Sequence, residues 1–129
     1  MNNSLKQKIL IVEDEPILRQ GLEILGDWEE NGLHLIGSAS NGKEALAHME
    51  TECPDIIITD IMMPVMDGLE ATREIRTMNR SDASAVVIIA MTANAFAEDK
   101  SKALKAGMDD YLTKPLESEK LIRALSRFL

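Results

Sequence analysis

The sequence predicts an α/β domain built on a parallel β-sheet. Five short apolar segments alternate with five segments of helical periodicity over 129 residues, a pattern typical of repeated βαβ units. Three apolar segments, around Ile11, Ile57 and Ile88, are continuously apolar, as expected of strands that helices cover on both faces. We therefore expect these three at the centre of the sheet. The predicted strands span approximately residues 8–12, 33–39, 55–59, 85–91 and 109–112.

The predicted helices have recognisable ends. The first begins at Glu15-Pro16, where proline suits a first turn, and runs to about Glu30 before Asn31-Gly32. Asp67 is placed to cap the third helix. The second follows Asn41-Gly42, the fourth covers residues 96–106 before Gly107, and the fifth follows Pro115-Leu116.

Size, charge and cysteine content narrow the class of protein. A chain of this length forms one domain with one core, so we expect residues 1–129 to be a single domain. The net charge of −8, from 14 basic and 22 acidic residues, argues against direct contact with nucleic acid or an anionic membrane. Apolar stretches stay far below the roughly 18 residues of a membrane span. The single cysteine, Cys53, excludes an intrachain disulfide and fits a cytoplasmic location.

Acidic residues follow two of the central strands. Glu13, Asp14 and Glu15 come directly after the first strand, and Asp60 comes at the end of the third. If those strands are parallel neighbours, Glu13, Asp14 and Asp60 converge at the carboxyl edge of the sheet, where open α/β folds bind ligands. Two carboxylates about 5 Å apart repel each other by roughly 3 kcal/mol at an effective dielectric constant near 20. Three together require a cation or raised pKa values, and Mg²⁺ is the simplest candidate.

Two further residues belong to the same edge. Thr92 closes the fourth strand, and Lys114 follows the fifth. This set is typical of a phosphoryl-transfer site with a carboxylate nucleophile, Asp60. A Mg²⁺ held by Asp14, Asp60 and a backbone carbonyl would screen the acids from an incoming phosphoryl group, and Lys114 and Thr92 would contact its oxygens.

Four motifs carry a resemblance to a known family. They are VEDEP at residues 12–16, TDIMMPVMDG at 59–68, MTA at 91–93 and DYLTKP at 110–115. In this order and spacing the chain resembles, over essentially its whole length, the receiver domain of two-component response regulators. The resemblance implies a flavodoxin-like, doubly wound (βα)5 fold with strand order 2-1-3-4-5.

The resemblance also implies a role for each matching residue. Such domains are not enzymes beyond their own phosphorylation and dephosphorylation. They accept a phosphoryl group from a sensor histidine kinase or histidine phosphotransfer protein, and an output domain or partner reads the conformational change. Some dimerise through the face formed by the fourth helix, fifth strand and fifth helix. The implied roles are phosphoacceptor for Asp60, acidic pair for Glu13 and Asp14, backbone carbonyl ligand for Met62, conserved-type lysine for Lys114, switch hydroxyl for Thr92 and switch aromatic for Tyr111.

One departure from the family pattern and two local similarities bear on these expectations. The acidic pair is Glu13-Asp14 instead of two aspartates, so we expect the longer Glu13 to reach the ion through water. Residues 27–42 resemble receivers that precede AraC-type DNA-binding domains. Residues 91–115 instead resemble receivers of hybrid sensor kinases, so the sequence leaves the output open.

Three other functions are possible on the same fold. A flavin phosphate binder would need a Gly, Ser and Thr-rich anion cradle after the first strand, where this chain has Glu13-Asp14-Glu15. An aspartyl-phosphate hydrolase would need an acid two residues after its nucleophile, where this chain has Met62. The third alternative is an interaction module of the same shape that is never phosphorylated.

Overall fold

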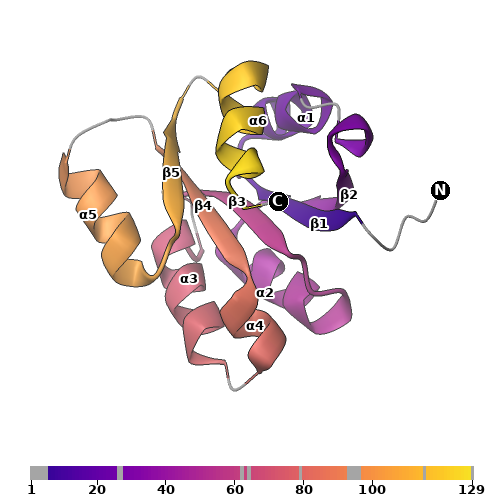
Figure 1. The fold of residues 1–129 in the computed structure, drawn as a ribbon. Helices are drawn as coiled ribbons and strands as arrows, with labels where there is room; N and C mark the ends of the chain where they lie inside the picture. The colour runs from indigo at the N-terminus through magenta and orange to yellow at the C-terminus, as the bar shows by residue number, and fades with distance from the viewer. Residues whose placement is uncertain are drawn as a thin grey trace.

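The computed structural model describes residues 6–25, 28–61, 63, 65–78, 80–92, 97–114 and 116–128. Its strands form one parallel sheet in the order β2-β1-β3-β4-β5 (Figure 1). The predicted fold class and strand order are confirmed, and the three continuously apolar strands are the inner ones. The strands are β1 (Gln7–Val12), β2 (Leu33–Ala39), β3 (Ile56–Asp60), β4 (Val87–Thr92) and β5 (Asp110–Thr113).

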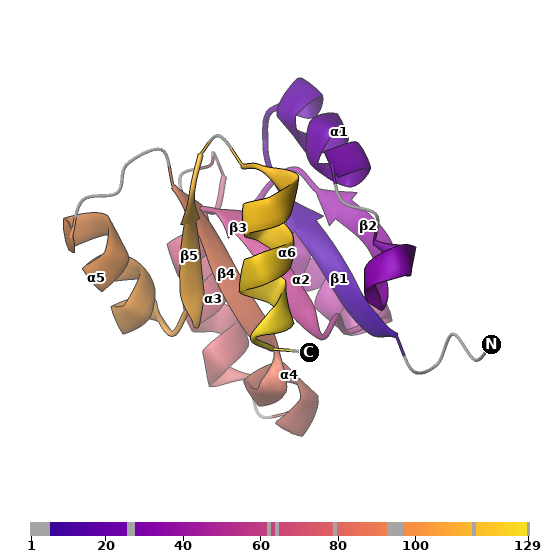
Figure 2. The same ribbon diagram turned by 45° about the horizontal axis from the view of Figure 1, so that its top comes forward.

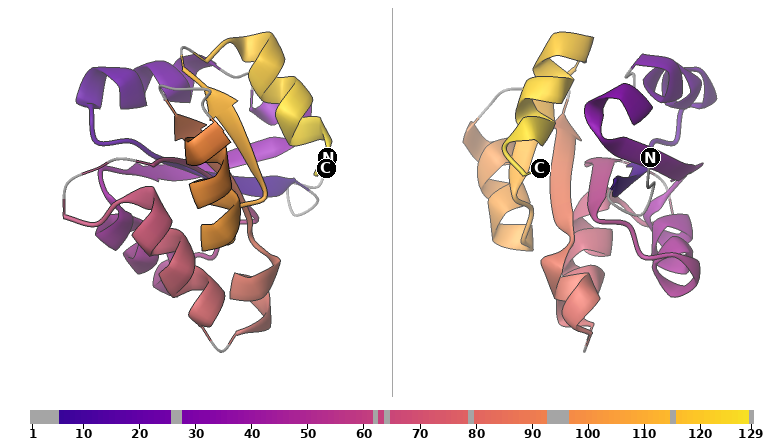
Figure 3. Two further views of the ribbon diagram at one scale, coloured as in Figure 1. Left: turned by 90° about the vertical axis from the view of Figure 1, so that its left-hand side faces the viewer. Right: turned by 45° about the vertical axis from the view of Figure 1, so that its right-hand side comes forward.

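Helices cover both faces of the sheet. Helices α1 and α6 lie on one face, and α2, α3 and α4 lie on the other (Figures 2 and 3). Among the described residues no helix is long and apolar enough to cross a bilayer. The helices are α1 (Pro16–Leu25), the 3₁₀ turn η2 (Glu29–Asn31), α2 (Gly42–Thr51), α3 (Gly68–Thr77), α4 (Ser81–Ala85), α5 (Ala97–Ala106) and α6 (Ser118–Ser126).

The period of two along the strands creates a separate core on each face. Ile57 and Ile88 pack with α2, α3, α4 and α5, whereas Ile58 and Ile89 pack with α1 and α6. All four side chains are at most 2% exposed. Burial of each contributes about 1.5–3 kcal/mol, so these strands are fixed in register and their ends are fixed in space.

The first helix ends earlier than predicted. Helix α1 stops at Leu25, and a 3₁₀ turn follows at residues 29–31 where the sequence suggests a helix continuing to Glu30. Trp28 is buried, and its indole Nε1 donates a hydrogen bond to the carbonyl oxygen of Glu23, 2.9 Å away. Burial of the large indole ring thus takes precedence over helix continuation, and Gly32, at φ 79°, ends the turn.

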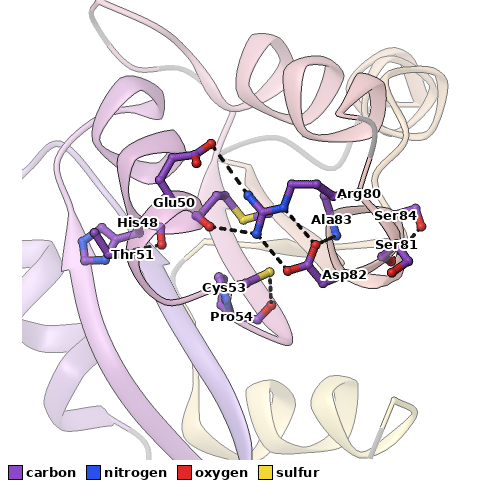
Figure 4. A network of polar contacts seen from close by, with 11 residues as sticks. His48, Glu50, Thr51, Cys53, Pro54, Arg80, Ser81, Asp82, Ala83 and Ser84 are labelled. Carbon is purple, nitrogen blue, oxygen red and sulfur yellow. Dashed lines mark hydrogen bonds and ion pairs between the residues drawn. The ribbon is translucent and has the colours of Figure 1, made fainter.

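A short helix, α4, precedes β4 where the sequence predicts the start of the strand at residue 85. Arg80 donates to both carboxylate oxygens of Asp82, at 3.0 and 2.8 Å, and to the carbonyl oxygen of Met49 at 3.1 Å (Figure 4). Asp82 also accepts from the backbone N–H of Ala83, whose side chain is fully buried. Ala85 therefore belongs to a helix, a correction to the predicted strand.

The loop after β3 is packed tightly against the end of that strand. The N–H of Gly68 donates to the carbonyl oxygen of Ile61 at 3.0 Å, and Asp67 caps α3 by accepting from Glu70 N–H at 2.8 Å. A Cβ atom at position 68 would lie 2.2 Å from the carbonyl oxygen of Asp60. Position 68 therefore requires glycine.

We predict that Gly68→Ala lowers the free energy of unfolding by about 1–3 kcal/mol, because the added methyl group collides with backbone and not with a movable side chain. The matched control is Gly21→Ala in α1, where nothing lies within 4 Å of the added Cβ. That change should stabilise the helix by about 0.5–1 kcal/mol. Urea unfolding measures both, and equal stability of the two variants would contradict the observed packing.

Candidate functional site

The candidate site lies at the carboxyl edge of the sheet. Asp60 ends β3, Thr92 ends β4, Glu13 follows β1 and Lys114 follows β5. Backbone hydrogen bonds join these strand ends, since Glu13 N–H donates to Ala39 at 2.9 Å and Lys114 N–H donates to Thr92 at 2.8 Å. The sheet thus brings together residues that are 101 positions apart in the chain.

Lys114 bridges two of the three predicted acidic residues. Its ammonium Nζ lies 2.7 Å from Asp60 Oδ2 and 3.0 Å from Glu13 Oε1. The Glu13 side chain is 1% exposed, that of Asp60 12% and that of Lys114 25%. The charges are therefore largely removed from water, and Lys114 compensates them within the protein.

Glu13 is held at both its side chain and its backbone. Its Oε2 accepts from the N–H of Glu15 at 3.2 Å, and its carbonyl oxygen accepts from Arg19 Nη1 at 2.8 Å. Burial raises the pKa of Glu13 above 4.5, and the hydrogen bonds from Lys114 and Glu15 offset only part of that increase. The nearby Asp60 charge raises it further.

The pKa of Lys114 responds to the same surroundings. Burial alone would lower it, but the hydrogen bonds to Asp60 and Glu13 dominate, so the pKa lies above 10.5. Lys114 therefore remains an ammonium ion at neutral pH.

The donor set suits a hard divalent cation. Ligand oxygens of Glu13, Asp14 and Asp60 all lie within 4.8 Å of one another. Oxygens around one octahedral Mg²⁺ are about 3.0 Å apart when adjacent and about 4.2 Å apart when opposite, given bonds of roughly 2.1 Å. The spread of the three carboxylates is close to that span. Because three carboxylates face one ammonium, a cation would also relieve their remaining repulsion.

The two predicted switch residues lie on neighbouring strands. Thr92 is 6% exposed at the end of β4. Tyr111 on β5 is half-buried. It packs against one of the two cores, the one between the sheet and helices α2, α3, α4 and α5. Lys100 of α5 places its Nζ 4.7 Å from the Tyr111 ring centroid, a cation–π distance. Met62, the predicted carbonyl ligand, lies outside the described residues.

Three residues that sequence reasoning did not identify hold the site in place. Arg19 binds the Glu13 carbonyl, Thr59 Oγ1 donates to the Asp60 carbonyl at 3.0 Å, and Gly68 lets the following loop approach that carbonyl. Glycine after Asp67 was a usable signal, because a glycine at the start of a helix is unexpected unless space is short. Arg19 and Thr59 gave no comparable signal.

Comparison with known proteins identifies the family. A family model described as the response regulator receiver domain matches residues 9–126. The chain belongs to this family. It is a phosphoaccepting switch domain of two-component signalling, which is a regulatory function and not that of a classical enzyme.

Individual relatives of this receiver domain differ in their wider context. The uncharacterized transcriptional regulatory protein YesN of Bacillus subtilis is 35% identical over 122 residues, which cover 95% of this chain and 32% of YesN. The receiver domain of sensor histidine kinase PA1611 from Pseudomonas aeruginosa, solved with magnesium in its active site cleft, is 38% identical. The two structures match with a TM-score of 0.80, and the match covers 95% of this chain and 96% of the PA1611 receiver domain. Chemotaxis protein CheY4 of Vibrio cholerae is 31% identical and matches with a TM-score of 0.84. The match covers 96% of this chain and 99% of CheY4.

An apolar cavity of about 660 Å³ opens beside the acidic centre of the receiver domain. Its walls include both Glu13 and Lys114, so whatever fills it lies next to the site. Ile17 at its rim is 82% exposed, and Leu18 is 50% exposed. The lining also includes Leu22 and Leu116.

We predict opposite pH dependences for two glutamate variants in the absence of Mg²⁺. Because the folded-state pKa of Glu13 is raised, the native state holds its proton more tightly than the unfolded state. The unfolding free energy of wild type minus that of Glu13→Gln should therefore fall as pH rises from about 4.5 upwards.

Glu44→Gln is the matched control for this experiment. A hydrogen bond from Ser40 lowers the pKa of Glu44, so the corresponding difference should increase as pH rises towards 4.5. Denaturant unfolding between pH 3 and pH 8 measures both differences. Parallel curves for the two variants would contradict the burial and bonding described for Glu13.

Proposed function

We propose that this receiver domain accepts a phosphoryl group on Asp60 from a phosphohistidine of a sensor histidine kinase or histidine phosphotransfer protein, in a Mg²⁺-dependent reaction. The observation that supports this most strongly is the bridge from Lys114 to Asp60 and Glu13 at the edge where three carboxylates meet. A carboxylate that is fixed beside an ammonium ion and is 12% exposed suits an incoming dianion.

The proposed reaction is a phosphoryl transfer between a nitrogen and an oxygen atom. A carboxylate oxygen of Asp60 attacks phosphorus while the phosphorus–nitrogen bond of the phosphohistidine breaks. The bonding electron pair goes to the imidazole nitrogen, and the ring, which carries a proton on its other nitrogen, leaves as neutral imidazole. Lys114 offsets the negative charge of the phosphoryl oxygens as they approach Asp60.

Magnesium would be held by Asp14 and Asp60, with Glu13 acting through water and the Met62 carbonyl as a further ligand. When bound, the ion supplies positive charge that lets a phosphoryl dianion approach a carboxylate. Asp14 is less buried than Glu13 and is well placed for a direct ligand. The magnesium coordinated in the PA1611 receiver domain supports the same assignment here.

The switch would act through Thr92 and Tyr111. A phosphoryl group on Asp60 adds acceptor oxygens near the end of β4, and the Thr92 hydroxyl can donate to one of them. Movement of Thr92 would leave room for the Tyr111 ring to turn inwards. The equilibrium between the two states then shifts on the surface formed by α5, β5 and α6, where an output domain, a partner or a second copy of the chain would bind.

The apolar cavity on α1 supports a protein as the donor. Exposed apolar side chains beside a charged centre are costly in water and gain free energy when a helical partner covers them. We place the domain in the cytoplasm as one unit over residues 1–129, with the output in another domain or partner. The net charge of −8 supports an output that does not involve nucleic-acid contact by this domain itself.

Acetyl phosphate tests the proposal without a partner protein. With Mg²⁺ present, mass spectrometry should find one added phosphoryl group on the wild type, and chelation of Mg²⁺ or Asp60→Asn should abolish it. Asp55→Asn is the matched control, because Asp55 lies before the opposite end of the same strand. That variant should be phosphorylated normally. An equal adduct on Asp60→Asn, or none on the wild type, would refute the assignment.

A further inference from the structure

Helix α5 lies next to β5, an edge strand of the sheet (Figures 1 and 2). Lysines occupy positions 100, 102 and 105 of this helix. Lys102 and Lys105 are exposed, as is usual for lysine, whereas Lys100 is half-buried. The ammonium Nζ of Lys100 lies 4.7 Å from the centroid of the Tyr111 ring. Lys100 therefore exchanges part of its hydration for a cation–π contact with β5.

The backbone of Tyr111 is fixed in the sheet. Tyr111 is in register with Ala90 of β4, and its N–H donates to Asp110 Oδ1 at 2.8 Å. The ring itself is half-buried and packs against the core between the sheet and helices α2, α3, α4 and α5. An inward movement of the ring is therefore a rotation about its own side-chain torsions.

The helix that carries this lysine is anchored at its other end. Arg76 of α3 donates from Nε to the carbonyl oxygen of Gly107 at 2.9 Å and from Nη2 to Asp109 Oδ2 at 2.9 Å. It also donates from Nη1 to the carbonyl oxygen of Val86, immediately before β4, at 2.7 Å. Helix α5 is thus attached to α3 and to the sheet by bonds that a rotation of the tyrosine ring does not disturb.

The cation–π contact favours one of two ring positions. If the Tyr111 ring turned inwards, the Lys100 ammonium would either stay at the surface and lose the ring, or follow the ring and lose its water. An ammonium ion in an apolar core without a paired anion is costly, so the contact is lost in the inward state. An interaction made in only one of two states shifts the equilibrium towards that state.

We propose that Lys100 restrains the switch, because its cation–π contact holds the Tyr111 ring in the resting position until Asp60 is phosphorylated. This inference rests on the proposed function, in which the ring turns inwards on phosphorylation. A cation–π contact at a partly exposed site changes an equilibrium constant by a factor of about two to five. That factor limits the active population before phosphorylation, and a phosphoryl group on Asp60 can overcome it.

The test measures the binding of beryllium fluoride, an anion that mimics a phosphoryl group on aspartate when Mg²⁺ is present. Because Tyr111 is the only tyrosine of the chain, ring-¹³C-labelled tyrosine gives one set of NMR signals that reports on this ring. In Lys100→Gln the half-saturating concentration of beryllium fluoride should fall about two- to fivefold, since more of the free protein is in the binding-competent state. The tyrosine signal of the free variant should also move towards its position in the saturated complex.

The direction of this change separates a restraint from a general effect of charge. Loss of a positive charge by itself weakens the binding of an anion, so it would raise the half-saturating concentration. Lys102→Gln removes the same charge from an exposed position on the same helix and should stay within about 1.5-fold of wild type. Lys100→Arg keeps a cation over the ring and should stay within about twofold. In a Tyr111→Leu background, Lys100→Gln should have no effect, because the ring is absent.

An equal or higher half-saturating concentration in Lys100→Gln overturns the inference. An equal decrease in Lys102→Gln, or a decrease that persists in the Tyr111→Leu background, overturns it as well. In these outcomes the wild type still binds beryllium fluoride, so Asp60 remains an acceptor. If the wild type neither binds beryllium fluoride nor is phosphorylated by acetyl phosphate, the proposed function itself is refuted, and the inference with it.

Discussion

The site depends on how the protein compensates the repulsion between carboxylates that the fold gathers at one edge of the sheet. Ligand oxygens of Glu13, Asp14 and Asp60 lie within 4.8 Å of one another, and the Lys114 ammonium contacts two of the three carboxylates, those of Glu13 and Asp60. Two carboxylates and an ammonium that are largely removed from water would be unstable as separate charges. Their compensation within the protein allows a site that still attracts a further cation.

The sheet provides this arrangement through its central strands. Residues such as Ile57 and Ile88 fix the register from one face, and their neighbours fix it from the other. Because a slip of one residue would reverse every side chain, the positions of Asp60 and Thr92 at the strand ends are determined by burial far from the site. Stability resides in the apolar strands, and function resides in the loops that follow them.

The sequence was sufficient for the sheet and for the site residues on it, because parallel strands have a simple pattern and deliver their ends to one edge. It was insufficient where packing overrides local preference. Burial of Trp28 ends the first helix early, and a short helix beside the Arg80–Asp82 pair takes in Ala85, which was predicted as the first residue of the fourth strand. Arg19 and Thr59 act through backbone carbonyl groups, which any residue type provides, so no sequence pattern marks them. The φ of 68° at Val65 is likewise a property of the backbone and leaves no trace in composition.

The most direct test of this account is the NMR signal of the Lys114 side-chain ammonium in Mg²⁺-free protein. Exposed lysine ammonium protons exchange with water too fast to be seen at neutral pH, whereas two carboxylates at 2.7 and 3.0 Å should slow that exchange. We expect a resolved Lys114 ammonium signal in the wild type and in Asp55→Asn, and a weakened or displaced signal in Asp60→Asn. A Lys114 signal that behaves like those of exposed lysines would contradict the account.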